Sequence, residues 1–201
     1  MQVPSFTKRF APLLVALAVA APASATDFSA LGAYWNTDAA GDTAGATLGF
    51  GIPFNDSLAL ELRASYFEEL SDDPLANAFD SDDPVFQDKG IQAIPLEAGL
   101  RFSFAPGQTF RPHIGAGGSY FLLDSDFGEV KDELGYYAVL GATIGDGEGA
   151  DFLIEGTWRK VSAQVELDPE QLDDIDDIDV QEKADLDLDG VGVNLGVRWS
   201  F

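Results

Sequence analysis

The last eleven residues of the chain, VGVNLGVRWSF, alternate strictly between apolar side chains and small, polar or charged ones. Successive side chains of a strand point to opposite faces, so one face of this segment is entirely apolar. That face holds Val191, Val193, Leu195, Val197, Trp199 and Phe201. The pattern predicts a strand between an apolar and a polar environment, and alternation alone leaves open which of its faces meets water.

The same period of two recurs along the chain. Further strands are predicted at about 28–36, 43–52, 57–68, 91–104, 110–123, 134–144 and 151–165. In the first of these, Phe28 and Tyr34 have one parity while Leu31 and Trp35 have the other, so its facing stays unassigned. In 151–165 the apolar parity changes near Lys160, which predicts a β-bulge. The pattern therefore predicts eight strands, long enough to cross a bilayer when tilted.

The connections between these strands fall into two classes. The segments 36–42, 69–90, 124–133 and 166–189 would lie at one end of the sheet, and the turns PFND, APGQT and GDGEGA at the other. Long loops at one end and tight turns at the other are typical of outer-membrane barrels. An even strand number also returns both termini to the tight-turn end. The sequence predicts an all-β fold, an eight-stranded antiparallel up-and-down transmembrane β-barrel.

The first residues of the chain have the features of a secretory signal peptide. Lys8 and Arg9 precede the apolar run APLLVALAVAAP, and Ala23, Ser24 and Ala25 resemble a cleavage site. The run is shorter than the roughly 20 residues that a membrane-spanning helix needs. We expect residues 1–25 to be a Sec-type signal peptide and residues 26–201 to be the barrel domain of an exported protein.

Five arginines, three glutamates and the histidine lie on the parity of the predicted strands that is opposite to the apolar one. A central arginine facing hydrocarbon would cost about 2 to 4 kcal/mol, so these side chains should point into the lumen and pair there. The predicted lumen charge network consists of Glu61, Arg63, Glu97, Arg101, Arg111, His113, Glu155, Arg159 and Arg198. A soluble lipocalin-like barrel would be apolar inside and charged outside, and is the alternative for the facing. A soluble barrel leaves unexplained why the long loops lie at one end and the tight turns at the other.

The overall charge narrows the possible partners. From residue 26 onward the chain has nine basic and 35 acidic residues, a formal charge of −26. Nucleic acid is therefore excluded as a partner. There is no cysteine, so no disulfide framework is expected. The acidic residues are concentrated, because 27 of the 35 lie in or beside the four predicted outer loops.

Three segments, IPLEAGLRFSF, FRPHIGAGGSYF and the terminal RWSF, carry a family resemblance. With them the chain resembles the small eight-stranded outer-membrane barrels of the OmpW, OmpX and OmpA membrane-domain kind. The resemblance implies a place in the bacterial outer membrane, with its lipid and lipopolysaccharide as partners, and a monomer. It also implies that Trp199 and Phe201 belong to the signal read by the barrel-assembly machinery.

Catalytic and metal-binding chemistry have little support in the sequence. His113 is the only histidine, and it is predicted to face inward, so no enzyme activity and no cofactor are expected. The segment 185–190 begins like a calcium loop, but its twelfth position is Gly196 where an EF-hand needs glutamate. A looser calcium site is hypothesised at Asp173, Asp174, Asp176 and Asp177, with a dissociation constant of about 10⁻⁴ to 10⁻³ M.

Two functions are compatible with this sequence. The first is a structural or surface-interaction role, with a lumen filled by side chains and long acidic loops outside. The second is a narrow channel for small solutes, as the OmpW resemblance implies. Eight strands enclose an interior that side chains roughly fill, and the many inward glycines either leave a passage or relieve crowding. The sequence favours the filled lumen.

Overall fold

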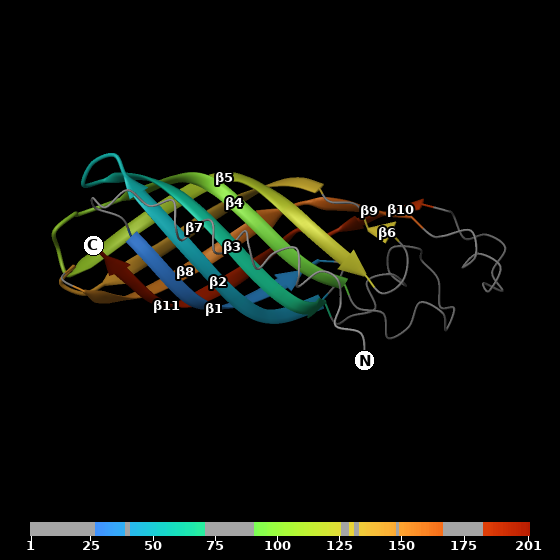
Figure 1. The fold of residues 1–201 in the computed structure, drawn as a ribbon, viewed down its shortest axis with the longest axis horizontal. Helices are drawn as coiled ribbons and strands as arrows, with labels where there is room; N and C mark the ends of the chain where they lie inside the picture. The colour runs from blue at the N-terminus through green and yellow to red at the C-terminus, as the bar shows by residue number, and fades with distance from the viewer. Residues whose placement is uncertain are drawn as a thin grey trace.

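The protein forms a closed barrel (Figure 1). The computed structural model describes residues 27–38, 41–70, 91–125, 129–130, 133–147, 149–166 and 183–201. The barrel strands are β1 (Asp27–Thr37), β2 (Gly41–Pro53), β3 (Leu58–Leu70), β4 (Ile91–Ser103), β5 (Phe110–Ser125), β7 (Glu133–Ile144), β8 (Ala150–Lys160) and β11 (Gly190–Ser200). Their order is β1-β11-β8-β7-β5-β4-β3-β2, and every neighbouring pair is antiparallel. The predicted eight-stranded antiparallel barrel is confirmed.

The first and last barrel strands close the sheet. β1 pairs with β11 along its whole length, from Asp27 opposite Ser200 to Thr37 opposite Gly190. Closure removes the unpaired edges at which other chains could add strands. The alternating segment at the end of the chain is therefore the strand that completes the barrel.

The two ends of the barrel differ. The three tight turns lie at one end together with the start of β1 and the end of β11, at the left of Figure 1. The first of these turns is stabilised by Asn55, whose side-chain oxygen accepts hydrogen bonds from the backbone N–H groups of Ser57 and Leu58 (2.9 Å each). In the third turn Gly147 has a φ of +80°, a conformation that glycine adopts without strain. We call this the turn end and the opposite one the outer end.

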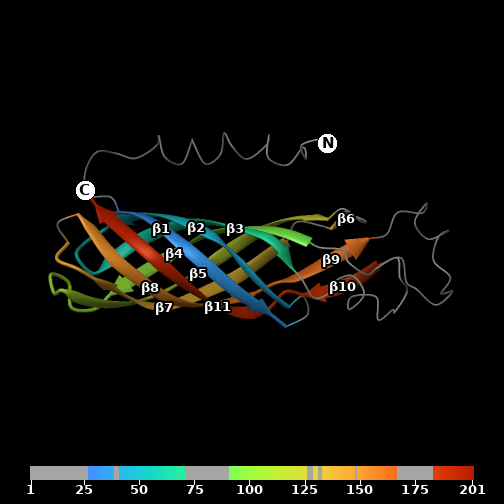
Figure 2. The same cartoon turned by 90° about the horizontal axis from the view of Figure 1, so that it is seen from below.

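A small second sheet extends the barrel at the outer end. It contains β6 (Glu129–Val130), β9 (Ser162–Glu166) and β10 (Lys183–Asp187) in the order β10-β9-β6, seen at the right of Figure 2. β9 and β10 continue the β8–β11 hairpin in the same register, because Gly190 faces Arg159 and Asp187 faces Ser162. The bulge predicted near Lys160 is therefore wrong.

The parity change that suggested the bulge has another cause. The odd-numbered side chains of β8 are buried, and Val161 and Ala163 continue that buried face (2% and 1% exposed). Asp189 joins the two strands across the gap, accepting hydrogen bonds from the Val161 N–H and from Lys160 Nζ (2.8 Å each). The apolar residues change parity because the lumen-facing side of the strands becomes apolar near the outer end. The odd-numbered residues still face inward on both sides of Lys160.

The outward face of the barrel is an apolar belt. Its middle contains exposed aliphatic residues: Leu48, Leu100, Ile114, Leu140, Ile154 and Leu195. Aromatic residues flank them at the outer end: Tyr34, Tyr66, Tyr120, Tyr136 and Trp158. Others flank them at the turn end: Phe28, Phe102, Phe104, Phe110 and Phe152. An apolar band between two aromatic girdles is the surface of a barrel embedded in lipid. None of the described residues belongs to a helix that could span a membrane.

Candidate functional site in the barrel lumen

Aromatic side chains fill the lumen near the outer end. Trp35 and Phe67 have ring centroids 5.2 Å apart, and Trp35 and Phe121 lie 5.9 Å apart. All three side chains are fully buried. We call them the aromatic cluster. β1 thus turns Leu31 and Trp35 inward and Phe28 and Tyr34 outward, which settles the facing that the sequence left unassigned.

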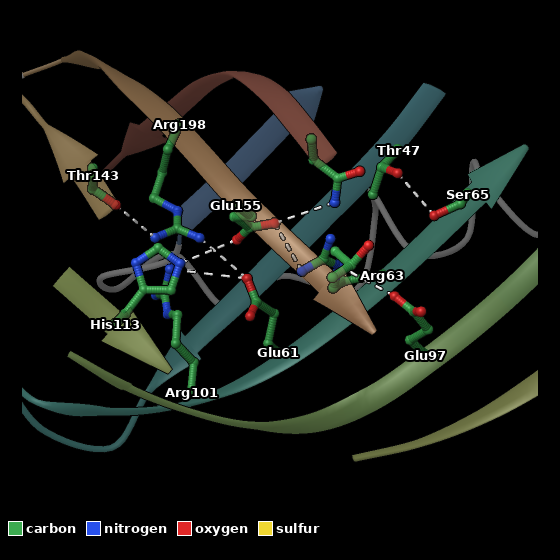
Figure 3. Close-up of polar contacts among 12 residues, drawn as sticks. Thr47, Glu61, Arg63, Ser65, Glu97, Arg101, His113, Thr143, Glu155 and Arg198 are labelled. Atoms are coloured by element: carbon green, nitrogen blue, oxygen red, sulfur yellow. Dashed lines mark hydrogen bonds and ion pairs between the residues drawn. The ribbon is translucent and has the colours of Figure 1, made fainter. Parts of the chain in front are cut away.

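A chain of alternating charges lies next to the aromatic cluster. Figure 3 shows four of its members, Glu97, Arg63, Glu155 and His113. Arg159 Nε donates a 2.8 Å hydrogen bond to Glu97 Oε1. Glu97 Oε2 lies 3.3 Å from Arg63 Nε, and Arg63 Nη1 lies 2.9 Å from Glu155 Oε2. Glu155 Oε1 is 3.2 Å from His113 Nε2. Each of these side chains is 1% exposed. We call these five residues the ionic layer.

Arg159 joins the ionic layer to the aromatic cluster. Its guanidinium carbon lies 5.6 Å from the ring centroids of both Trp35 and Phe67. A guanidinium group stacks on aromatic rings and also donates to carboxylates, whereas an ammonium group lacks this planar geometry. The two sets of side chains therefore form one continuous packed unit inside the barrel.

Two glycines make room for the large side chains of the lumen. A Cβ at Gly141 would lie 2.8 Å from His113 Nε2 and 2.9 Å from Glu155 Cγ. A Cβ at Gly99 would lie 2.6 Å from the Tyr137 hydroxyl. At these two positions the glycines accommodate neighbouring side chains, which agrees with the crowding explanation and not with an open passage.

A second group of charges lies closer to the turn end. Arg198 donates to Thr143 Oγ1 and to Glu61 Oε1 (3.1 Å each). Arg101 Nη1 lies 3.9 Å from the same Glu61 oxygen, and Arg101 Nη2 donates a 2.6 Å hydrogen bond to Asp27 Oδ2. Figure 3 shows the two guanidinium groups approaching Glu61 from different strands. This group separates the ionic layer from the turn end.

Of the nine residues predicted to form the lumen network, Arg111 alone is half-buried. It lies at the turn end, where it pairs with Asp151 and donates to the backbone oxygens of Gln108 and Gly145 (3.0 and 3.1 Å). Arg111 therefore holds two tight turns together at the rim, and the other eight predicted residues lie buried within the barrel.

The sequence did not identify every charged partner. Asp27 and Asp151 were missed because they stand at strand ends, where acidic residues are common in turns. With them the described lumen contains five arginines and five carboxylates: Arg63, Arg101, Arg111, Arg159, Arg198, Asp27, Glu61, Glu97, Asp151 and Glu155. Asn194 was also missed, and its amide lies 3.4 Å from Glu155 Oε2. The described arginines and carboxylates of the lumen are therefore equal in number.

The residues of the expected assembly signal lie at the turn end. Trp199 faces outward and stacks on Phe28, with ring centroids 5.8 Å apart. Phe201 follows β11 and is 80% exposed. Because Phe201 makes so little contact with the barrel, its removal should change the folded barrel little, and an effect on insertion would reflect recognition during assembly.

Deleting Phe201 is expected to prevent insertion of the barrel without changing export. The measurement is the amount of heat-modifiable barrel in the membrane fraction, compared with the total exported protein. Phe54→Ser is the matched control, since Phe54 is another exposed aromatic at the turn end (61%) outside the terminal strand. The assembly role would be refuted by a Phe201 deletion that accumulates in the membrane at the level of the parent.

The hypothesised calcium ligands Asp173, Asp174, Asp176 and Asp177 lie outside the described residues. Within the described part of the chain, no group of three or more metal-ligating side chains is present. The calcium hypothesis therefore stays a prediction. Calorimetry should show weak calcium binding that is lost when these four aspartates are changed to asparagine. If sodium chloride at the same ionic strength produced the same heat as calcium, the signal would come from charge screening and the calcium site would be refuted.

Solved structures share this fold. The outer membrane protein OprG from Pseudomonas aeruginosa superposes with a TM-score of 0.69 at 16% identity, covering 88% of this chain and 95% of OprG. Neisserial surface protein A superposes with a TM-score of 0.56 at 13% identity, covering 88% of this chain and 96% of that protein. The outer membrane protein AlkL, solved in DMPC lipid bilayers, superposes with a TM-score of 0.55 at 12% identity, covering 88% of this chain and 90% of AlkL.

The chain therefore has the fold of the small eight-stranded outer-membrane barrels, as its sequence segments suggested. No protein-family model and no curated protein matches it.

Proposed function

We propose that this protein is an integral barrel of the bacterial outer membrane with a closed lumen. Its role is in envelope structure and in contacts made by its acidic outer loops. The observation that carries the proposal is the packed unit of the ionic layer and the aromatic cluster. Their side chains are almost completely buried, so they occupy the lumen that a solute would have to cross.

The outward face supports the membrane location. Leucine, isoleucine and aromatic side chains cover it, while the arginines and glutamates described above point inward. A soluble barrel would need the reverse arrangement. The fold shared with a barrel solved in lipid bilayers and the features of a signal peptide at residues 1–25 point in the same direction.

The distribution of acidic residues supports a role at the outer surface. In the sequence, 27 of the 35 acids lie in or beside the four predicted outer loops, which predicts a dense negative charge at that end of the barrel. Divalent cations prefer such hard oxygen ligands and would also bridge to the phosphates of lipopolysaccharide. We infer that the loops meet this lipid through shared cations and that the barrel acts as a monomer, inserted by the barrel-assembly machinery.

A narrow channel for small solutes is the second candidate. It is favoured by a pocket at the turn end that reaches Arg101 and Arg198. Several buried polar atoms above it, including Arg159 Nη2 and Ser119 Oγ, also have no hydrogen-bond partner among the described residues. Water could fill such sites. A solute would still have to displace the ion pairs of Arg63, so the closed lumen fits the geometry better.

Solute uptake by liposomes tests the proposal. Liposomes containing the barrel are expected to take up glycine, glucose and small organic acids no faster than liposomes without protein. The heat-modifiable band of the same sample shows that the barrel is inserted. If solute uptake rose in proportion to the amount of inserted protein, the closed-lumen proposal would be refuted and the channel would be supported.

A further inference from the structure

A pocket opens at the turn end of the barrel, beyond the ionic layer. Its volume is about 630 Å³, which is within the range of sites for small organic molecules. All three tight turns contribute to its rim through Phe54, Pro106 and Gly147. Arg101 and Arg198 come from within β4 and β11 and form its floor. This pocket lies on the turn-end side of the ionic layer and the aromatic cluster, so it can be filled without opening the packed part of the lumen.

The floor of the pocket has hydrogen-bond donors without acceptors. The side chains of Arg101 and Arg198 are only 5% and 6% exposed. Nε and Nη1 of Arg101 and Nε of Arg198 have no hydrogen-bond partner within the part of the chain that the structure describes. Both guanidinium groups lie within 4 Å of one oxygen of Glu61, at 3.9 and 3.1 Å, so they are neighbours. Buried donors of this kind are normally satisfied by water or by a bound acceptor.

Three carboxylates near the floor already accept hydrogen bonds, and the first, Glu61, accepts from Arg198 (3.1 Å). Asp27 accepts from Arg101 and from the hydroxyl of Ser200 (2.6 and 2.8 Å). Asp151 accepts from Arg111 and from the backbone N–H of Gly147. Among the described residues no acceptor satisfies the remaining donors, so a bound acceptor or water has a place at this floor. Oxyanions suit guanidinium groups because the planar fork of donors matches their oxygen atoms.

The wall of the pocket determines the rest of the ligand. Pro53, Phe54, Leu58 and Pro106 line it, so apolar surface lies beside the arginine floor. Asp56 and Asp146 also line it, and they belong to the turns and not to the floor. A ligand whose charge is confined to one oxyanion head and whose body is apolar fits this arrangement. We propose that the pocket binds a small organic anion of this class from the space facing the turn end.

Calorimetry with phenyl phosphate and inorganic phosphate on the purified barrel in detergent tests this proposal. Phenyl phosphate is expected to bind about tenfold more tightly than inorganic phosphate, because its ring is buried against the wall. Arg101→Lys should weaken both probes by about tenfold, since it keeps the charge beside Asp27 but loses the guanidinium donors. The heat-modifiable band verifies that this variant folds.

Phe54→Ser distinguishes the contribution of the apolar wall to binding from that of the arginine floor. Phe54 lies on an exposed turn, so the variant should fold normally. It should abolish the preference for phenyl phosphate while leaving the affinity for inorganic phosphate unchanged. Phe110→Ser is the matched control, because Phe110 is exposed at the same end (56%) but does not line the pocket. Absence of saturable binding, or equal effects of Phe54→Ser and Phe110→Ser, would overturn the proposal.

Discussion

Glu97→Ala is expected to lower the free energy of unfolding by about 3 to 5 kcal/mol, the usual cost of removing one partner from a buried ion pair. The side chain of Glu97 is 1% exposed and lies between two arginines, 2.8 Å from Arg159 Nε and 3.3 Å from Arg63 Nε. Without its carboxylate, Arg159 and Arg63 each lose their ion pair with Glu97, and among the described residues Arg63 keeps the pair with Glu155. The variant therefore leaves an excess of buried positive charge among the described residues of the lumen.

Urea unfolding of the barrel in lipid vesicles, followed by the heat-modifiable band, measures this effect. Lys160→Met is the control, because the ion pair of Lys160 with Asp189 is exposed and such pairs contribute little to stability. Glu97→Gln should lie between the parent and the alanine variant, since it keeps an oxygen that can accept from Arg159 Nε. If Glu97→Ala unfolded at the same urea concentration as the parent, the ionic layer would not stabilise the barrel.

Leu195→Arg is expected to destabilise the inserted barrel by about 2 to 4 kcal/mol, the cost of arginine facing the middle of a bilayer. Leu195 is 47% exposed on the outward face and lies opposite Gly32 and Ile154, in the middle of β11. Its side chain would have to carry the charge into hydrocarbon. The same unfolding measurement in vesicles, together with the fraction of inserted protein, records the loss.

Val191→Arg provides the comparison on the same face of the same strand. Val191 is 59% exposed and lies opposite Trp158 of the outer aromatic girdle. An arginine near the interface costs only about 0 to 1 kcal/mol, because its charge reaches the polar region. Equal losses for the two variants would mean that the belt does not lie in a bilayer in this orientation.

Much of the fold could be predicted because alternation records two environments. The strand number followed from the alternation itself, and the outward facing of Leu195 followed once the charged parity was assigned to the lumen. The inward position of Arg63 and Glu97 followed from the cost of placing charge in hydrocarbon. Their partners did not follow, because Glu97 and Arg159 are 62 positions apart and meet only through the order of the strands.

The aromatic cluster could not be predicted in the same way. The inward charges of the other strands predict a polar lumen, and β1 carries aromatic residues of both parities. Trp35 points inward because Phe67 and Phe121 already make the outer part of the lumen apolar. The prediction of a bulge at Lys160 was wrong for the same reason, because Val161 and Ala163 face inward as Arg159 does. Alternation shows that the two faces of a strand meet different environments. Where the lumen itself changes from polar to apolar, the apolar parity changes as well, although the same residues still face inward.

Current recording in a planar bilayer tests the central claim most directly. The claim is that the ionic layer and the aromatic cluster close the lumen of an inserted barrel. We expect a flat current trace at both polarities of the membrane potential, from protein whose insertion is verified by its heat-modifiable band. Stable, discrete openings whose number rises with the amount of inserted barrel would contradict the closed lumen.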